Sequence, residues 1–373
     1  MKILFLTPWY PDENKPNHGV FVREQACALA EHHLVVVISA KVDYESFGLS
    51  SYTVKESVFR KVKEFRLTIK RSLPLYNQWN YFLVSRKVAL NVIQSFQPDV
   101  IHGNIGYPGG FWSWLVSKKS RKPYVITEHT FITNNFRSLV HRWLTLFAMK
   151  KAAAVITVSK KSAKEILKYV RANVRVIPNM VDVSRFSIQP YSDGAVSIGF
   201  IGRLTREHVK GLDVLLRALS HVKGDFVLHV AGDGGFISEY KRMVEQLQLQ
   251  EKVKFHGFID YEKIPTFLNR LHFFVNTSRF ETFGISIVEA MASGLPVVCF
   301  DNGGPGDFVD ASNGILVENQ NEEKLKEGIA WMIANYQYFD RNQIREYVLS
   351  KFSKEKFVRS AEQVYSEVIG SSV

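Results

Sequence analysis

The chain has 373 residues, carries a formal net charge of +12 and is 46% hydrophobic. This length is too great for one hydrophobic core and predicts two domains of ordinary size. No apolar leader and no run of roughly 20 apolar residues is visible, and the two cysteines, Cys27 and Cys299, form neither a disulfide framework nor a metal motif. These features argue against a membrane-spanning or disulfide-rich protein and predict a cytoplasmic location.

The first half of the chain is expected to alternate strands with helices. A helix is expected at 19–31, and a half-exposed strand at 66–70, where apolar and polar residues alternate. Short apolar runs predict the buried strands, at residues 2–7, 34–39, 99–102, 124–127, 155–158 and 174–177.

The second half repeats this pattern after a polar stretch at 189–194, which we interpret as the domain boundary. Strands that alternate with helices predict parallel, doubly wound sheets. We therefore expect one α/β domain at 1–190, a second at 191–352, and a terminal helix within 353–373. The strands of the second domain are expected at residues 196–201, 226–231, 252–255, 273–276, 296–300 and 315–317.

The positive charge is concentrated in the first domain. Residues 1–190 contain 28 Lys and Arg against 12 Asp and Glu, whereas the remainder contains 20 and 24. Such asymmetry predicts that the first domain contacts something acidic, which could be nucleic acid, an anionic membrane surface or a phosphorylated substrate.

The stretch 280–298 is the most informative part of the sequence. Glu281 precedes Phe283-Gly284, which is expected to open a helix that carries Glu289 and ends at Gly294. Free backbone N–H groups at a helix start can hold an anion. A carboxylate just outside that start suits sugar hydroxyls, and a second one on the helix suits ribose hydroxyls.

As a whole, this stretch resembles the E-x7-E motif of the family 4 retaining glycosyltransferases, which have the GT-B fold. The resemblance implies two Rossmann-like domains facing a cleft, with the terminal helix crossing back to the first domain. It also implies that Glu281 contacts the donor sugar and Glu289 the ribose, while Phe283, Gly284 and Ile285 belong to the donor site.

Two further segments of the second domain resemble parts of the family's donor site. Gly202-Arg203 follows a strand and Lys210 precedes a helix, at the sheet edge where open α/β folds bind ligands. By resemblance, Arg203 and Lys210 hold the diphosphate and stabilise the leaving group. The chain contains no Asp-x-Asp pair, so no metal cofactor is expected. His256, Gly257 and Phe258 match the segment that contacts the base, although packing at the end of a strand would also explain them.

The first domain contributes two positions to the resemblance. His129 follows a buried strand and matches the family histidine that contacts the donor sugar. Gly19 opens the first helix and matches the glycine-bearing loop near the diphosphate, although His18 stands where the family usually has a second glycine.

A basic stretch, 55–71, holds seven Lys and Arg against two Glu, and aromatic residues follow at 76–82 and 111–114. This combination suits a membrane interface or single-stranded nucleic acid. Alternatively, the aromatic residues belong to the core and the charges form a solvated face.

We therefore predict a metal-independent, retaining glycosyltransferase that moves a sugar from a UDP- or GDP-sugar to a glycan or lipid-linked glycan acceptor, in cell-surface polysaccharide or lipopolysaccharide synthesis. A peripheral position at the inner face of the plasma membrane is expected, and a nucleic-acid partner is not. Two alternatives remain, a nucleotide-sugar 2-epimerase of the same fold and a non-catalytic basic protein that binds membrane or nucleic acid. The combination of Arg203, Lys210, Glu281 and Glu289 argues against both.

Overall fold

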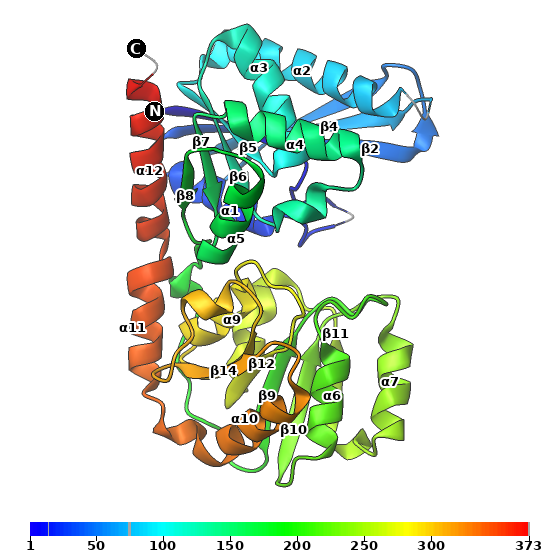
Figure 1. Cartoon of the computed structure of the whole chain (residues 1–373), viewed down its shortest axis with the longest axis vertical. Coiled ribbons are helices and arrows are strands. Elements are labelled where there is room, and N and C mark those ends of the chain that lie inside the picture. Colours follow the sequence, from blue (N-terminus) through cyan, green and yellow to red (C-terminus); the bar gives the residue numbers. More distant parts are fainter. Residues whose placement is uncertain (14, 74–75, 372–373) are drawn as a thin grey trace. The chain divides into compact units, whose positions relative to one another are not determined.

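The computed structural model describes residues 1–13, 15–73 and 76–371. The chain divides into two compact units, residues 1–178 with 357–373, and residues 179–356 (Figure 1). The second unit begins before the boundary expected at 191, because residues after Pro178 bond to it. The Val181 N–H donates to the Phe352 carbonyl at 2.9 Å, and Arg345 Nη2 donates to the Val183 carbonyl at 3.0 Å.

The first unit is built on an eight-stranded sheet in the order β3-β4-β2-β1-β5-β6-β7-β8. Apart from β3, neighbouring strands are parallel, as the alternation of strands and helices predicts. The strands are β1 (Lys2–Thr7), β2 (Leu34–Phe47), β3 (Tyr52–Phe59), β4 (Val62–Arg71), β5 (Val100–Asn104), β6 (Tyr124–Glu128), β7 (Ala154–Thr157) and β8 (Val174–Val176).

The β3–β4 hairpin departs from the expected parallel sheet. The strand β3 was not predicted from the sequence, and it pairs antiparallel to β4 from Phe59↔Val62 onward. The two turn residues between them, Arg60 and Lys61, have φ of 49° and 75°. A two-residue hairpin loop needs this left-handed backbone and is usually Asn-Gly or Asp-Gly. Arg-Lys lacks that signal, and the hairpin therefore escaped the sequence analysis.

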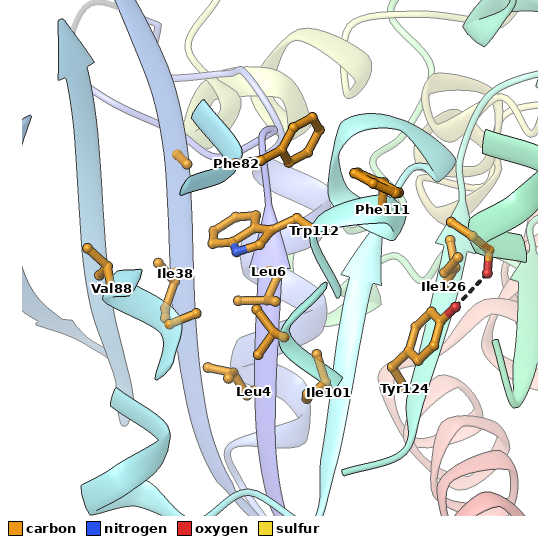
Figure 2. Packing of buried hydrophobic residues seen from close by; sticks show 14 of the residues in the cluster. Leu4, Leu6, Ile38, Phe82, Val88, Ile101, Phe111, Trp112, Tyr124 and Ile126 are labelled. Carbon is orange, nitrogen blue, oxygen red and sulfur yellow. Dashed lines mark hydrogen bonds between the residues drawn. The ribbon is translucent and has the colours of Figure 1, made fainter. Parts of the chain in front are cut away.

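The core of the first unit lies between the sheet and the helices on one of its faces. Figure 2 shows Trp112 beside Leu6, with Ile126 and Tyr124 further along the sheet. Trp112 is fully buried, and the Tyr124 hydroxyl donates to the Ala148 carbonyl at 2.7 Å. The helices of this unit are α1 (Val20–Leu29), α2 (Asn77–Phe96), α3 (Phe111–Ser120), α4 (Leu139–Lys151) and α5 (Lys160–Tyr169).

The terminal helix α12 (Lys354–Gly370) belongs to the first unit from residue 357 onward. Ile101 belongs to the core just described, so the next residue of β5, His102, faces the other side of the sheet. There His102 Nδ1 lies 2.6 Å from the Tyr365 hydroxyl of α12. This helix therefore covers the sheet face opposite that core.

The second unit has a six-stranded parallel sheet in the order β11-β10-β9-β12-β13-β14. Side chains from α6, α7 and α10 form one buried cluster on this sheet. The strands are β9 (Val196–Ile201), β10 (Phe226–Ala231), β11 (Val253–Gly257), β12 (Phe273–Asn276), β13 (Val297–Asp301) and β14 (Gly314–Glu318). The helices are α6 (Leu212–Ser220), α7 (Ile237–Gln246), α8 (Ile264–Leu268), α9 (Ile285–Ala292), α10 (Glu322–Asn335) and α11 (Arg341–Phe352).

Within the described part of the chain, none of the helices combines the length and the apolar character that a bilayer-spanning segment requires.

Candidate functional site

Two charged residues predicted from the sequence meet at the carboxyl edge of the second sheet. Lys210 Nζ lies 2.7 Å from Glu281 Oε2, and the two side chains are 31% and 13% exposed. Lys210 immediately precedes the start of α6, and Glu281 comes from the loop after β12. Residues that are 71 positions apart therefore form one partly accessible ion pair.

Polar residues at the end of β12 fix both partners of this pair. The Thr277 hydroxyl donates to the Gly211 carbonyl at 2.9 Å, which holds the start of α6 against the end of β12. The Ser278 hydroxyl lies 3.3 Å from Glu281 Oε2. Both Thr277 and Ser278 are fully buried, so the pair is anchored by the sheet rather than by flexible surface.

Helix α9 begins directly beside Glu281. Gly284 is its N-cap, with φ of 97°, a left-handed conformation that favours glycine. A methyl group built on Gly284 would lie 3.4 Å from Cγ of Glu281, so the glutamate folds back over the helix start. The Glu281 carbonyl also accepts from the Gly304 N–H at 2.8 Å. The Ile287 N–H donates to the Gly284 carbonyl at 3.0 Å, whereas the N–H groups of Ile285 and Ser286 have no acceptor within the helix. The start of α9 therefore lies next to the Lys210–Glu281 pair.

Phe283 and Ile285 flank the glycine. Phe283 is 3% exposed, and its ring packs against Phe308 and Phe352 at centroid distances of 5.6 and 5.4 Å. Its side chain therefore anchors the loop in the core, while Ile285 is half-buried.

Glu289 lies on the same helix but in a different environment. Its side chain is buried, with 6% exposed. Burial raises the pKa of Glu289 to about 7, and the Arg185 guanidinium opposes this shift. Arg185 itself is held by the Tyr261 carbonyl at 2.7 Å. A ligand could therefore meet Glu289 only through the small exposed part of its surface.

Arg203 is exposed after β9, and the residue before it, Gly202, lies beside Lys210. A Cβ atom built on Gly202 would lie 2.9 Å from Cβ of Lys210, so the residue next to Arg203 packs directly on Lys210. The structure therefore brings both predicted cations to one part of the sheet edge.

The segment predicted to contact a base, residues 256–258, lies at the end of β11 and just after it. The strand β11 is the outermost strand of this sheet. The His256 ring stacks on that of His229 at 5.2 Å, with 3.0 Å between His256 Nε2 and His229 Nδ1. Burial, followed by the charge of His256, lowers the pKa of His229 to about 4. Gly257 accepts from the Gly232 N–H at 2.8 Å, and the Phe258 side chain is 52% exposed.

The first unit holds the other two predicted site residues. His129 follows β6 and is 5% exposed, with Nε2 2.9 Å from Asn104 Oδ1 and its ring 4.7 Å from that of Phe21 on α1. Gly19 has φ of 72°, and a Cβ atom there would lie 2.5 Å from the Trp9 carbonyl carbon. The chain's own backbone therefore requires a glycine at this position, whether or not a ligand approaches it.

Three polar residues near the predicted site residues were not predicted from the sequence: Thr277, Ser278 and Glu128. Glu128 is fully buried and accepts from the Gly106 N–H at 2.8 Å, from Asn135 Nδ2 at 2.8 Å and from the Thr130 N–H and hydroxyl at 3.0 and 2.8 Å. A usable signal was present for Thr277 and Ser278, because polar residues directly follow the apolar strand β12.

Comparisons with known proteins identify the family of the chain. The family model described as Glycosyl transferases group 1 matches residues 184–350, and that described as Glycosyltransferase Family 4 matches residues 18–185. The putative teichuronic acid biosynthesis glycosyltransferase TuaC of Bacillus subtilis is 24% identical over 356 residues, which cover 88% of each chain.

Two further proteins are similar to this chain. The N-acetylgalactosamine-N,N'-diacetylbacillosaminyl-diphospho-undecaprenol 4-alpha-N-acetylgalactosaminyltransferase of Campylobacter jejuni is 29% identical over 212 residues, or 54% of this chain and 57% of that protein. The crystal structure of Anabaena HepE in complex with UDP has a TM-score of 0.76 and 21% identity, covering 98% of this chain and 100% of that one. With both family models matched along its length, the chain belongs to glycosyltransferase family 4 and is a glycosyltransferase of the GT-B type.

Proposed function

We propose that this glycosyltransferase uses a nucleotide sugar, with UDP or GDP as the nucleotide, and that Arg203, Lys210 and the start of α9 hold its diphosphate. The observation that carries the proposal is the Lys210–Glu281 pair, 2.7 Å apart and adjacent to the N-terminal start of α9. An ammonium, a guanidinium and a helix start suit a diphosphate, while a carboxylate suits sugar hydroxyls. UDP is the favoured nucleotide, because the HepE complex contains it.

The charges of this site would act on the leaving group. When the bond between the sugar C1 and the diphosphate oxygen breaks, negative charge grows on that oxygen. Fixed cations and N–H groups stabilise this charge more in the transition state than in the bound substrate. We infer a same-face substitution that retains the configuration at C1, in which the acceptor hydroxyl bonds to C1 and its proton passes to the departing phosphate.

The acceptor is proposed to be a glycan or a lipid-linked glycan. TuaC is named for teichuronic acid biosynthesis, and the C. jejuni relative for a diphospho-undecaprenol acceptor. Both names fit the excess of positive charge in residues 1–190, since a diphosphate or an acidic glycan carries negative charge.

A thermal-shift panel of UDP-, GDP- and ADP-sugars tests the donor assignment. A ligand that binds the folded state alone raises the melting temperature, by an amount that grows with its concentration relative to Kd. We expect one nucleotide to stabilise the unmodified protein and to lose this effect in Arg203→Ala. Turnover of UDP-N-acetylglucosamine without an acceptor would instead support the epimerase, and no shift with any nucleotide would contradict the proposal.

A peripheral membrane position is the second part of the proposal. For the membrane contact we favour a surface other than the basic stretch 55–71. Of that stretch, Arg60 and Lys63 pair with Glu24 and Glu56 at 2.9 and 3.2 Å. In contrast, the first turns of α2 and α4 expose apolar side chains and are joined by Gln78 and His141, whose Nε2 atoms are 2.9 Å apart. The exposed fractions are 64% for Trp79, 84% for Leu139, 58% for Val140 and 61% for Trp143.

We propose that this α2–α4 surface, defined by Trp79, Leu139, Val140 and Trp143, inserts into anionic bilayers. Aromatic and apolar side chains beside Arg142 of α4 suit the interface of such a membrane. In a flotation assay with anionic vesicles, Leu139→Ser with Trp143→Ser should abolish binding, whereas the matched charge reversal Lys61→Glu with Lys63→Glu should weaken it. Equal binding by both variants and the unmodified protein would refute the assignment, as would no binding at low salt.

A further inference from the structure

The first unit contains a cavity that the donor site does not use. It has a volume of about 310 Å³ and lies past the end of β1, between the loop after that strand and the strands β2, β3 and β4. In open α/β sheets, ligands bind outside the carboxyl ends of strands, and small-molecule pockets begin at about 300 Å³. Both the place and the size suit a sugar-sized group.

The lining of the cavity is unusually basic. Four cationic side chains, Lys15, Lys41, Lys55 and Arg66, face two carboxylates, Asp12 and Glu13. Glu64, which pairs with Arg66 outside the lining, is a third carboxylate. The cations are still in excess by one, so the cavity attracts a negatively charged ligand.

Arg66 is the fixed element of this lining. Its Nη2 atom lies 2.8 Å from Glu64 Oε2, and Glu64, at 1% exposed, is held by the Tyr10 hydroxyl at 2.7 Å and the Ser57 hydroxyl at 3.1 Å. Burying a carboxylate is costly unless it is paired and hydrogen-bonded. Here the buried network fixes the guanidinium at the cavity wall and leaves it N–H donors that Glu64 does not use.

The lysines are more exposed than Arg66, whose side chain is 25% exposed. Lys41 pairs with Asp12 at 2.8 Å and Lys55 with Glu13 at 2.6 Å, and these lysine side chains are 48% and 67% exposed. Exposed pairs of this kind contribute little to stability, so the lysines can turn toward an incoming anion at small cost. One rigid cation and two movable ones are an arrangement that binds an oxyanion and adapts to its shape.

We propose that this cavity binds an oxyanion of the acceptor, either a sugar carboxylate or a phosphate. The proposal rests on the proposed function, because it assigns the anion to the acceptor rather than to the donor. It deepens that function by making the enzyme selective for acidic acceptors.

Calorimetric titration of the full chain with three probes tests this inference. Glucuronate carries a carboxylate, glucose 1-phosphate carries a phosphate, and glucose is the neutral reference. We expect at least one anion to bind and glucose not to bind. The stronger of the two anions identifies whether the oxyanion comes from an acidic sugar or from a phosphate.

Three variants assign the bound anion to the cavity. Glu64→Gln with Arg66→Gln removes both charges, so no unpaired charge is left buried. This double variant should raise Kd for the anion about 10- to 100-fold, the effect of losing hydrogen bonds to a charged group. Lys63→Gln removes a cation of the same strand whose partner is the exposed Glu56, and Arg203→Gln alters the donor site. Both of these should leave Kd unchanged.

If the double variant does not fold, Lys41→Gln replaces it, with an expected rise in Kd of about two- to five-fold. Unchanged Kd in the cavity variants, a loss of binding in Arg203→Gln, or equal affinity for glucose would each overturn the inference. The thermal-shift panel reports separately on the donor site, so failure of the proposed function appears there and not in this titration.

Discussion

Glu64 and Glu128 of the first unit differ from Glu281 and Glu289 of the second in how many hydrogen-bond donors surround them. In the first unit, Glu64 and Glu128 are 1% and 0% exposed, and each is surrounded by hydrogen-bond donors of its own unit. In the second unit, Glu281 is held by one lysine and one serine, and the charge that acts on Glu289 is that of Arg185. A carboxylate with all of its acceptor sites filled is framework, whereas one with sites left over can bind a ligand.

The largest expected effect concerns the cations beside Glu281. Arg203→Ala and Lys210→Ala should each lower the rate of transfer by about 10² to 10³, or roughly 3 kcal/mol, the usual effect of removing one preorganised group that stabilises developing charge. Urea unfolding should change little, because Arg203 is exposed and Lys210 is 31% exposed. Near-normal turnover in either variant would remove that residue from the mechanism.

Substitutions of Glu281 and Glu289 should change different kinetic constants. We expect Glu281→Gln to lower kcat by about 10- to 100-fold, because a hydrogen bond to a charged group strengthens as the sugar gains positive charge. Glu289→Gln should mainly raise the donor KM, because the ribose does not change during transfer. The roles would be wrong if separate measurements of kcat and KM gave the reverse ranking.

The pH dependence of the free energy of unfolding gives a second test of Glu289. Its pKa is about 7 in the folded state and 4.5 for a free side chain, so folding favours the protonated form. This contribution is fully present below pH 4.5 and is lost as pH rises through 7, a loss of roughly 3 kcal/mol. Urea unfolding at pH 5 and pH 8 should therefore show less weakening at high pH in Glu289→Gln than in the unmodified protein. Parallel pH profiles would show that Glu289 does not titrate in this range.

Glu128 tests the role of the buried, fully hydrogen-bonded carboxylates of the first unit. Burial raises the pKa of this carboxyl group, while bonds from Gly106, Thr130 and Asn135 lower it. In Glu128→Gln the amide group would face one of these donors, and we expect a loss of about 1 to 3 kcal/mol in the free energy of unfolding. Nucleotide binding should not change, because Arg203, Lys210 and the start of α9, which are proposed to hold the diphosphate, lie in the other unit. A variant as stable as the unmodified protein would show that these bonds contribute little.

The sequence predicted the fold well where patterns are local. The strands β1, β9, β10 and β12 begin and end where the apolar runs do. The hairpin turn at Arg60-Lys61 was missed because its left-handed residues are not those that usually adopt this conformation. The length of β2 was missed as well, since its second half pairs with β4 along a polar, partly exposed edge.

The candidate site was predictable in its residues but not in its contacts. A motif marks Glu281, and a basic pair marks Arg203 and Lys210, but nothing in the sequence shows that Lys210 and Glu281 bond to each other. That contact depends on the neighbouring positions of β9 and β12 in the sheet, which is a tertiary property. The burial of Phe283 and Glu289 depends on packing in the same way.

The smallest expected effect is that of removing metal ions. Many glycosyltransferases hold a divalent metal on the donor diphosphate through an Asp-x-Asp pair, and this chain has none. If Arg203, Lys210 and the start of α9 supply that positive charge instead, excess EDTA should leave the rate of transfer unchanged within error. Because the cations would stand in for the metal, Mn²⁺ should also fail to rescue Arg203→Ala. A loss of activity in EDTA that Mg²⁺ or Mn²⁺ restores would mean that these protein charges do not stabilise the leaving group sufficiently. Glu281, which has few hydrogen bonds, would then bind a ligand other than the donor sugar.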